Sequence, residues 1–229
     1  MTTPDQFTLP KYDRAALITI DVQNDTLDGG TFTVPGTTTI LPQISRLCRT
    51  FRDAGRPIVH VIRIYTPDAE DADRCRRHSL LAGKPILLKG SSGRRPAEPL
   101  LPGKDVRIDD DLLMSGAIQP IGPQEAIVFK PRWGAFYHTP LEAFLRERTV
   151  STLVFSGCNY PNCPRTSIYE ASERDFRITA AVDAISGMAP SDISGLEKIG
   201  VNCAASEAIC RLVEKEHSEP KIGKMEVTA

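Results

Sequence analysis

The sequence predicts a doubly wound α/β fold, in which a mostly parallel, six-stranded sheet carries helices on both faces. Short apolar runs typical of buried strands alternate with segments whose apolar residues recur at helical spacing. Several of these runs end in polar or charged residues, as strands do when their carboxyl ends form a ligand site. No repeat or shift in composition divides the 229 residues, so we expect a single domain over residues 1–229.

The first part of the chain supplies a strand and a helix. After an arm over residues 1–14 that we expect to be loosely held, residues 15–20 form an apolar run typical of a buried strand. Apolar side chains at helical spacing between Ile40 and Phe51 predict a helix, which the threonine hydroxyls of residues 37–39 can cap.

A long connection over residues 65–122 follows the second strand, which we place at residues 57–64. The segment is rich in proline, glycine and charge, and it predicts an irregular excursion with one short helix near residues 71–81. Apolar anchors such as Leu87 and Leu113 favour an ordered lid or a subunit-contact arm, and the sequence leaves both open. Its acidic side chains would suit a cationic ligand, although a solvated loop surface is the more common reason for such a pattern.

The remaining elements follow this connection in close succession. A strand over residues 125–129 precedes a helix in which Thr139 and Glu142 have the spacing of a capping box. A strand over residues 152–155 leads through a turn into a helix, and a further strand begins at residue 177. The chain then closes with a short helix capped by Ser191, a last strand near Val201, a helix through Leu212 and a frayed final dozen residues.

Composition and charge argue against several classes of function. The chain is 41% hydrophobic and has a formal net charge of −1, without a basic stripe for nucleic acid or an apolar run of membrane-spanning length. Its first residues lack the apolar core of a secretory signal, so we expect a cytoplasmic protein whose six cysteines are reduced. The cysteines and histidines have no metal-ligand spacing, and no nucleotide fingerprint is present, so we expect no metal and no cofactor.

Three chemically complementary residues fall at, or just past, the predicted carboxyl ends of strands: Asp21, Lys130 and Cys163. Because these ends share one edge of a parallel sheet, the three side chains can meet in one crevice. A carboxylate can take the proton of a thiol nucleophile, while a neighbouring ammonium and a helix start would favour the thiolate. Each residue alone could be a turn cap, a surface lysine or a buried cysteine. Their combination predicts a nucleophilic site.

The chain resembles the isochorismatase-like cysteine hydrolase superfamily in four stretches that cover most of it outside residues 65–122. They are ALITIDVQNDTL, IVFKPRWGAF, HTPLEAFLRERTVSTLVFSG and GCNYPNCPRTSIYEASERDFRITAAVDAISG. The resemblance implies that Asp21, Lys130 and Cys163 form a catalytic triad, which hydrolyses C–N bonds of amides, carbamoyl groups or lactams through a thioester. It also implies a cis peptide before Asn159, with the oxyanion held by the N–H groups of Asn159 and Cys163.

Departures from the family pattern narrow the chemistry that the resemblance implies. Nicotinamidases of the superfamily carry an Asp-x-His metal motif after the second strand, where this chain has VIRIYTPD, so metal binding and nicotinamidase activity are not expected. Isochorismatases proper lack the cysteine, so Cys163 favours amide chemistry. The turn CNYPNCPRT is most similar to that of the streptothricin hydrolase group, which implies a cationic lactam as substrate.

The surroundings of the predicted nucleophile suggest how a substrate is held. We expect Trp133, Phe136 and Tyr160 to line the substrate pocket and Asn24 to bond the substrate, although core packing or loop structure would also explain these residues. The resemblance and the apolar anchors of the excursion favour a homodimer or higher homo-oligomer.

Two other classes of function stay open at this point. One is a small-ligand-binding protein without turnover. The other is a thiol redox protein that uses Cys158 and Cys163, which lie five residues apart across the turn.

Overall fold

A seven-stranded sheet forms the centre of the computed structural model, which describes residues 5–218. The strands lie in the order β3-β4-β2-β1-β5-β6-β7, and every neighbouring pair is parallel except β3 with β4. Their bounds are β1 (Ala15–Ile20), β2 (Ile58–Ile62), β3 (Gln119–Gly122), β4 (Glu125–Phe129), β5 (Thr152–Gly157), β6 (Arg177–Ile185) and β7 (Asn202–Ala204).

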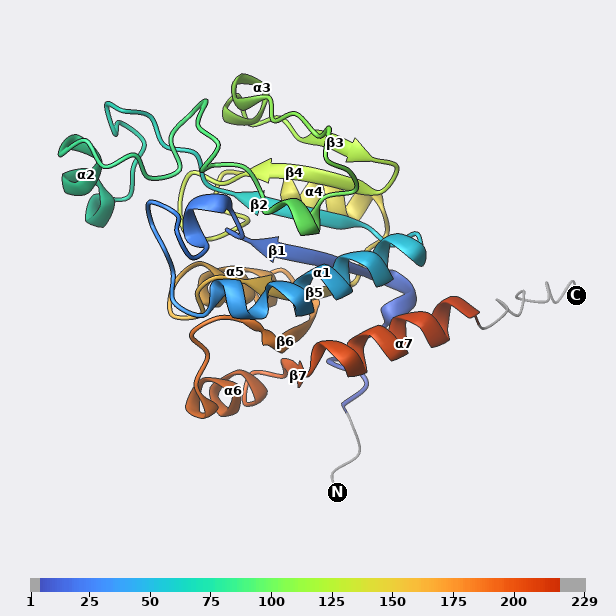
Figure 1. The fold of residues 1–229 in the computed structure, drawn as a ribbon. Coiled ribbons are helices and arrows are strands. Elements are labelled where there is room, and N and C mark those ends of the chain that lie inside the picture. The colour runs from blue at the N-terminus through green and yellow to red at the C-terminus, as the bar shows by residue number, and fades with distance from the viewer. Residues whose placement is uncertain (1–4, 219–229) are drawn as a thin grey trace, which may run out of the picture.

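Helices cover both faces of this sheet (Figure 1). Helices α1 and α7 pack on one face, and α4 and α5 pack on the other. The helix bounds are α1 (Thr37–Asp53), α2 (Arg74–Leu81), α3 (Asp110–Met114), α4 (Leu141–Glu147), α5 (Cys163–Ser172), α6 (Pro190–Glu197) and α7 (Ser206–Ser218). Single 3-10 turns span Tyr12–Arg14, Asn24–Thr26 and Glu98–Leu100.

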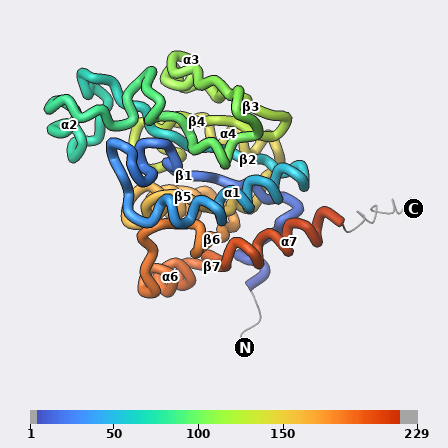
Figure 2. The backbone as a smooth tube through the Cα atoms, viewed as in Figure 1, coloured from blue at the N-terminus to red at the C-terminus, as the bar shows by residue number. Residues whose placement is uncertain are grey.

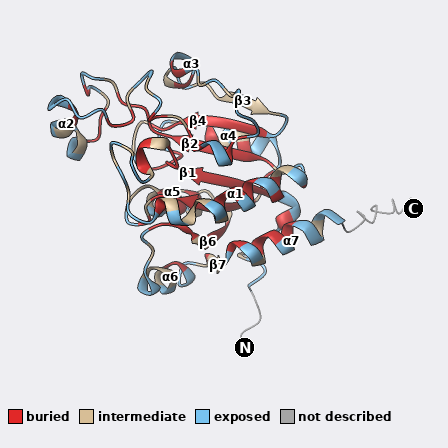
Figure 3. Ribbon diagram, viewed as in Figure 1, coloured by how far each residue is buried: buried red, intermediate tan, exposed pale blue. Residues whose placement is uncertain are grey.

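Strand β1 is central because its side chains are apolar on both sides. All six of its residues are buried, as the red strands in Figure 3 show. Ile18 and Ile20 join the core under α4 and α5, whereas Leu17 joins the core under α1 and α7. Each buried aliphatic side chain contributes about 1.5–3 kcal/mol of hydrophobic free energy. The alternation therefore fixes the register of β1 in the sheet. It thereby also fixes the position of the residue that follows β1 at the carboxyl edge of the sheet.

The predicted doubly wound, mostly parallel α/β fold is confirmed, but the predicted number of six strands is wrong. The seventh strand is β3, which lies inside the segment expected to be an irregular excursion. Its sequence, QPIG, contains Pro120 and Gly122, both unfavourable in a strand interior. Pro120 is tolerated because β3 is an antiparallel edge strand, where a missing backbone donor can face outward.

The side-chain caps predicted for α1 and α6 are wrong, and the capping box predicted for α4 forms only in part. Helix α1 begins after Gly36, whose φ of 82° is left-handed, and the hydroxyl of Thr37 lies 3.3 Å from that of Ser186 instead. At α4 the Thr139 hydroxyl accepts the N–H of Leu141 at 3.4 Å and donates to the Ala135 carbonyl at 2.6 Å, but Glu142 completes no capping box within the described residues. Ser191 lies within α6 rather than before it. The Thr37 hydroxyl is engaged by a residue distant in sequence, which helix spacing does not reveal.

The segment over residues 65–122 is ordered; its first part, with α2, lies beyond the carboxyl ends of the strands, and its last part returns along the sheet to form β3 (Figure 2, teal to green). It contains α2 and α3 instead of one helix. Two buried side chains after β1 tie it down. The Gln23 amide donates to the carbonyls of Arg63 at 2.8 Å and Arg94 at 2.6 Å. The Asp25 carboxylate accepts the backbone N–H of Leu87 at 2.7 Å.

The N-terminal arm is held more firmly than expected. Tyr12 is buried, and the backbone N–H of Lys11 donates to the Thr152 hydroxyl at 2.9 Å. The frayed end predicted for the last dozen residues falls almost wholly outside the described range. Over residues 5–218, no helix combines the length and apolarity needed to span a bilayer.

Replacing Asp25 tests how the excursion is anchored. Asp25→Ala leaves the buried N–H of Leu87 without its acceptor, so we expect the free energy of unfolding to fall by about 1–3 kcal/mol. Denaturant titration followed by circular dichroism measures the change. Asp28→Ala is the matched control, because Asp28 is exposed and its side chain makes no such bond within the described residues. Equal stability of the two variants would contradict the assignment.

Candidate active site

Three elements of the sheet bring Asp21, Lys130 and Cys163 to one edge. Asp21 follows β1, and its backbone N–H donates to Val61 of β2 at 3.0 Å. Its φ of 52° is left-handed, a conformation that aspartate adopts more readily than most residues. Lys130 follows β4, and its N–H donates to Ile62 at 3.0 Å. Cys163 is the first residue of α5.

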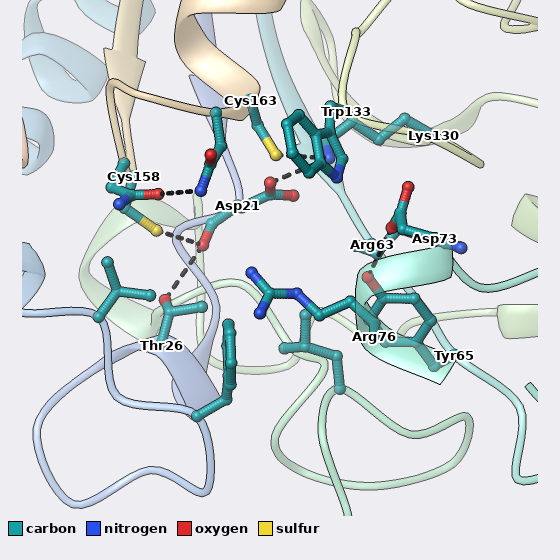
Figure 4. Close-up of a pocket in the computed structure, with 15 residues that line it drawn as sticks. Asp21, Thr26, Arg63, Tyr65, Asp73, Arg76, Lys130, Trp133, Cys158 and Cys163 are labelled. Carbon is teal, nitrogen blue, oxygen red and sulfur yellow. Dashed lines mark hydrogen bonds and ion pairs between the residues drawn. The ribbon is translucent and has the colours of Figure 1, made fainter. Parts of the chain in front are cut away.

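The ammonium group of Lys130 lies at the centre of the three side chains (Figure 4). Its Nζ is 2.9 Å from Asp21 Oδ2 and 3.3 Å from Cys163 Sγ, and it donates to the Arg132 carbonyl at 3.2 Å. The residue is only 1% exposed. All three ammonium protons are thus directed to acceptors, while Asp21 Oδ1 is buried without a hydrogen-bond partner.

The electrostatics of the site keep the resting thiol protonated. Burial raises the pKa of Cys163, the Asp21 charge raises it further, and Lys130 lowers it by less. Burial lowers the pKa of Lys130, but the charges of Asp21 and Cys163 outweigh it, so the net shift is upward. One ammonium balances one carboxylate, and a thiolate would add a second anion to a dry site. Lys130 thus lowers the pKa of Cys163, as expected, but burial and the Asp21 carboxylate outweigh it.

The turn before Cys163 is packed closely against the end of β1. Gly157 has a φ of 127°, and a Cβ atom there would lie 2.2 Å from the Ile20 carbonyl oxygen. The Cys158 N–H donates to this same carbonyl at 2.9 Å, and the Cys158 thiol donates to the Asp21 carbonyl at 3.1 Å. The peptide between Cys158 and Asn159 is cis. Only glycine fits at residue 157, where the two backbones approach closely. This approach and the two hydrogen bonds of Cys158 hold the turn beside Asp21.

A cavity of about 490 Å³, including the space open to solvent at its mouth, lies in front of these residues. Trp133 and Asn159, both predicted site residues, line it. The remaining lining comes from the loop after β1, the turn before α5 and the 65–122 segment. It comprises Thr26, Phe32, Val34, Arg63, Tyr65, Asp73, Arg76, Leu87, Cys158 and Asn162.

Three residues predicted to contact the substrate do not line this cavity. Phe136 is buried in the core, where its ring centroid lies 6.0 Å from that of Phe176. Tyr160 is also buried in the core. Asn24 is turned toward the excursion, and its amide donates to the Ser92 carbonyl at 3.0 Å. These residues follow strand ends in sequence, but the backbone turns their side chains away.

Sequence reasoning missed the contribution of the 65–122 segment to the cavity wall. The carboxylate of Asp73, just before α2, accepts the hydroxyl of Tyr65 at 2.9 Å, and Arg76 of the same helix lines the cavity. The signal was a short helix predicted near residues 71–81 with interleaved charges. Nothing in its spacing indicated which charges face inward. Over residues 5–218, no group of three or more His, Cys, Asp or Glu side chains could hold a metal ion.

Comparisons with known proteins identify similar chains and a similar fold. An isochorismatase domain model matches residues 15–195. A probable inactive nicotinamidase from Arabidopsis thaliana is 29% identical over 199 residues, covering 83% of this chain and 92% of the relative. A ureidoacrylate amidohydrolase from Methylobacterium radiotolerans is 26% identical over 196 residues, covering 77% and 69%. The crystal structure of an isochorismatase family protein from Desulfovibrio vulgaris has a TM-score of 0.73 at 29% identity, covering 88% and 98%.

The protonation state of the nucleophile can be tested by alkylation. Because the pKa of Cys163 is raised, its iodoacetamide reaction should increase with pH around a midpoint above the value of about 8.5 for a free cysteine. Asp21→Asn removes the neighbouring negative charge, so Lys130 should then lower the midpoint. Peptide mass spectrometry distinguishes Cys163 from the other thiols, with glutathione as the reagent control. An upward shift in Asp21→Asn would contradict this electrostatic account.

Proposed function

The chain belongs to the isochorismatase family, and from that premise we propose that it is a cysteine hydrolase acting on a small-molecule amide or lactam. It cleaves a carbon–nitrogen bond through a thioester on Cys163. The observation that carries the proposal is the contact of one buried ammonium, that of Lys130, with both the Asp21 carboxylate and the Cys163 thiol. A lysine is buried in this way at little cost only when its charge is paired.

The first half of the reaction forms the thioester. Asp21 takes the proton from Cys163 Sγ as the sulfur attacks the substrate carbonyl carbon, and the carbonyl electron pair moves to oxygen. When the tetrahedral intermediate collapses, the C–N bond breaks, and Asp21 returns the proton to the leaving nitrogen. Lys130 stays protonated and offsets the negative charge as it moves between carboxylate and sulfur.

The second half hydrolyses the thioester. Asp21 takes a proton from water, and the water oxygen attacks the thioester carbon. The C–S bond then breaks, the acid product leaves, and Cys163 recovers its proton from Asp21. One water is consumed, and the products are a carboxylic acid and an amine or ammonia.

The backbone N–H groups of Asn159 and Cys163 are the proposed donors to the oxyanion. Cys163 begins α5, so its N–H has no intrahelical acceptor and lies at the positive end of the helix dipole. Asn159 lines the same cavity. Donors fixed before the reaction stabilise the developing charge without reorganisation, which commonly accounts for a large share of the rate.

The acidic residues of the excursion do not support a streptothricin-type cationic lactam as the substrate. Three of these carboxylates are paired with cations: Asp71 with Arg63 at 3.1 Å, Asp110 with Arg94 at 2.6 Å, and Asp111 with Lys89. Asp73 alone among the acidic residues of the excursion lines the cavity, and it already accepts the Tyr65 hydroxyl. A cation entering the site would find no free carboxylate from this segment.

Loss of the nucleophile is the direct test of the proposed reaction. Cys163→Ala and Cys163→Ser should lower kcat/KM by roughly 10³-fold or more, and Asp21→Asn by about 10²- to 10⁴-fold. Ammonia release and product mass over a panel of amides and lactams measure the activity. Cys75→Ser is the control, because Cys75 is an exposed thiol of α2. Undiminished turnover in either Cys163 variant would remove the mechanism.

Two alternatives make different predictions in the same assay. A ligand-binding protein without turnover would bind an amide and release no product. A redox protein would need Cys158, whose buried thiol donates to Asp21 and whose pKa burial raises to about 12. Full amidase activity in Cys158→Ala would count against the redox alternative. Homo-oligomerisation and a cytoplasmic setting stay predictions of the sequence.

A further inference from the structure

The charges that line the cavity are unequal in number. The lining holds two carboxylates, Asp21 and Asp73, and three cations, Arg63, Arg76 and Lys130. Lys130 is paired with Asp21 at 2.9 Å, and Arg63 Nε lies 3.8 Å from Asp73 Oδ2. Within the described part of the chain, Arg76 alone among these cations has no carboxylate at ion-pairing distance. Arg63 is also paired with Asp71, outside the lining, at 3.1 Å, so Arg76 is the cation of the lining whose charge has no direct partner among the described residues.

Arg76 extends from α2 into the middle of the cavity, toward the end of β1 (Figure 4). The central carbon of its guanidinium lies 4.4 Å from the centroid of the Phe32 ring, so one face of the charged plane rests on an aromatic ring. Its N–H groups have no hydrogen-bond acceptor among residues 5–218. The stacking orients the guanidinium while leaving its planar fork of donors free.

The neighbouring arginines of α2 serve other purposes. Arg77 donates from Nε to the Ala72 carbonyl at 3.1 Å and from Nη2 to the Glu70 carbonyl at 3.0 Å, so it ties the helix to the preceding loop. Arg74 is exposed and does not line the cavity. Of the three, only Arg76 is placed to meet a bound small molecule.

We propose that Arg76 binds a carboxylate group of the substrate and thereby selects amides that also carry a carboxylate. The inference rests on the proposed amide hydrolysis and adds the substrate class to it. A guanidinium fork matches the two oxygens of a carboxylate and forms paired, charge-assisted hydrogen bonds. The substrate carboxylate supplies the ion-pair partner that Arg76 lacks among residues 5–218. The cavity wall also includes Phe32, Val34 and Leu87, which suits a substrate with a short hydrocarbon spacer between its carboxylate and its amide.

The test compares matched pairs of amides that differ in one charge. Malonamate, succinamate and glutaramate each carry a carboxylate, and the corresponding diamides replace it with a neutral carboxamide of the same shape. For the wild type, kcat/KM should favour the best of the acids over its diamide by at least about 10-fold. Arg76→Gln should reduce that ratio by about 10- to 100-fold, and Arg76→Lys should retain part of it. Arg74→Gln, with the same loss of charge on the same helix, should leave the ratio unchanged.

Binding separates failure of this inference from failure of the proposed reaction. Calorimetry on Cys163→Ala measures binding of the three acids without turnover, alone and combined with Arg76→Gln. If the acids bind and the Arg76 change abolishes binding, but the wild type releases no ammonia, the anion site stands and the hydrolase proposal falls. If the wild type hydrolyses acids and diamides equally, or Arg76→Gln keeps the full ratio, the anion site falls and the hydrolase proposal stands. Absence of binding by all three acids also overturns the anion site.

Discussion

The ammonium group of Lys130 lies in the interior of the protein, 1% exposed, and its need for compensating partners holds the site together. An unpaired buried charge costs several kcal/mol, so Lys130 must be met by Asp21, Cys163 and the Arg132 carbonyl in one place. The parallel sheet satisfies this requirement because β1 and β4 end at the same edge of the sheet, and the turn between β5 and α5 lies at that edge too. Burial of the strands fixes their register, because a shift by one residue would move every side chain to the opposite face of the sheet.

The same charge balance governs the proposed chemistry. One carboxylate and one ammonium neutralise each other, so the thiol stays protonated until a substrate carbonyl accepts electron density from sulfur. Asp21 Oδ1 has no hydrogen-bond partner within residues 5–218 and can receive the proton. Reactivity is thus coupled to the presence of substrate, which limits side reactions of a buried nucleophile.

The proposed catalysis and the proposed selectivity depend on different parts of the chain. The sheet and α5 supply the proposed reacting groups, while the segment after β2 supplies Arg63, Tyr65, Asp73 and Arg76 to the cavity wall. The two parts are joined by the buried side chains of Gln23 and Asp25, which bond backbone groups of the excursion. Related chains can vary such a segment without disturbing the sheet edge, since loops are more variable than the elements they connect.

The sequence by itself determined the α/β alternation, the strand that ends at Asp21, the strand that ends at Lys130 and the helix that starts at Cys163. These depend on local periodicity and on the rule that parallel strand ends share an edge. Only the tertiary structure decided that Phe136 and Tyr160 pack into the core, that Pro120 belongs to an edge strand and that Arg76 faces the cavity. The orientation of a side chain after a strand end, or on a short helix, depends on contacts between residues distant in sequence. Periodicity does not contain those contacts.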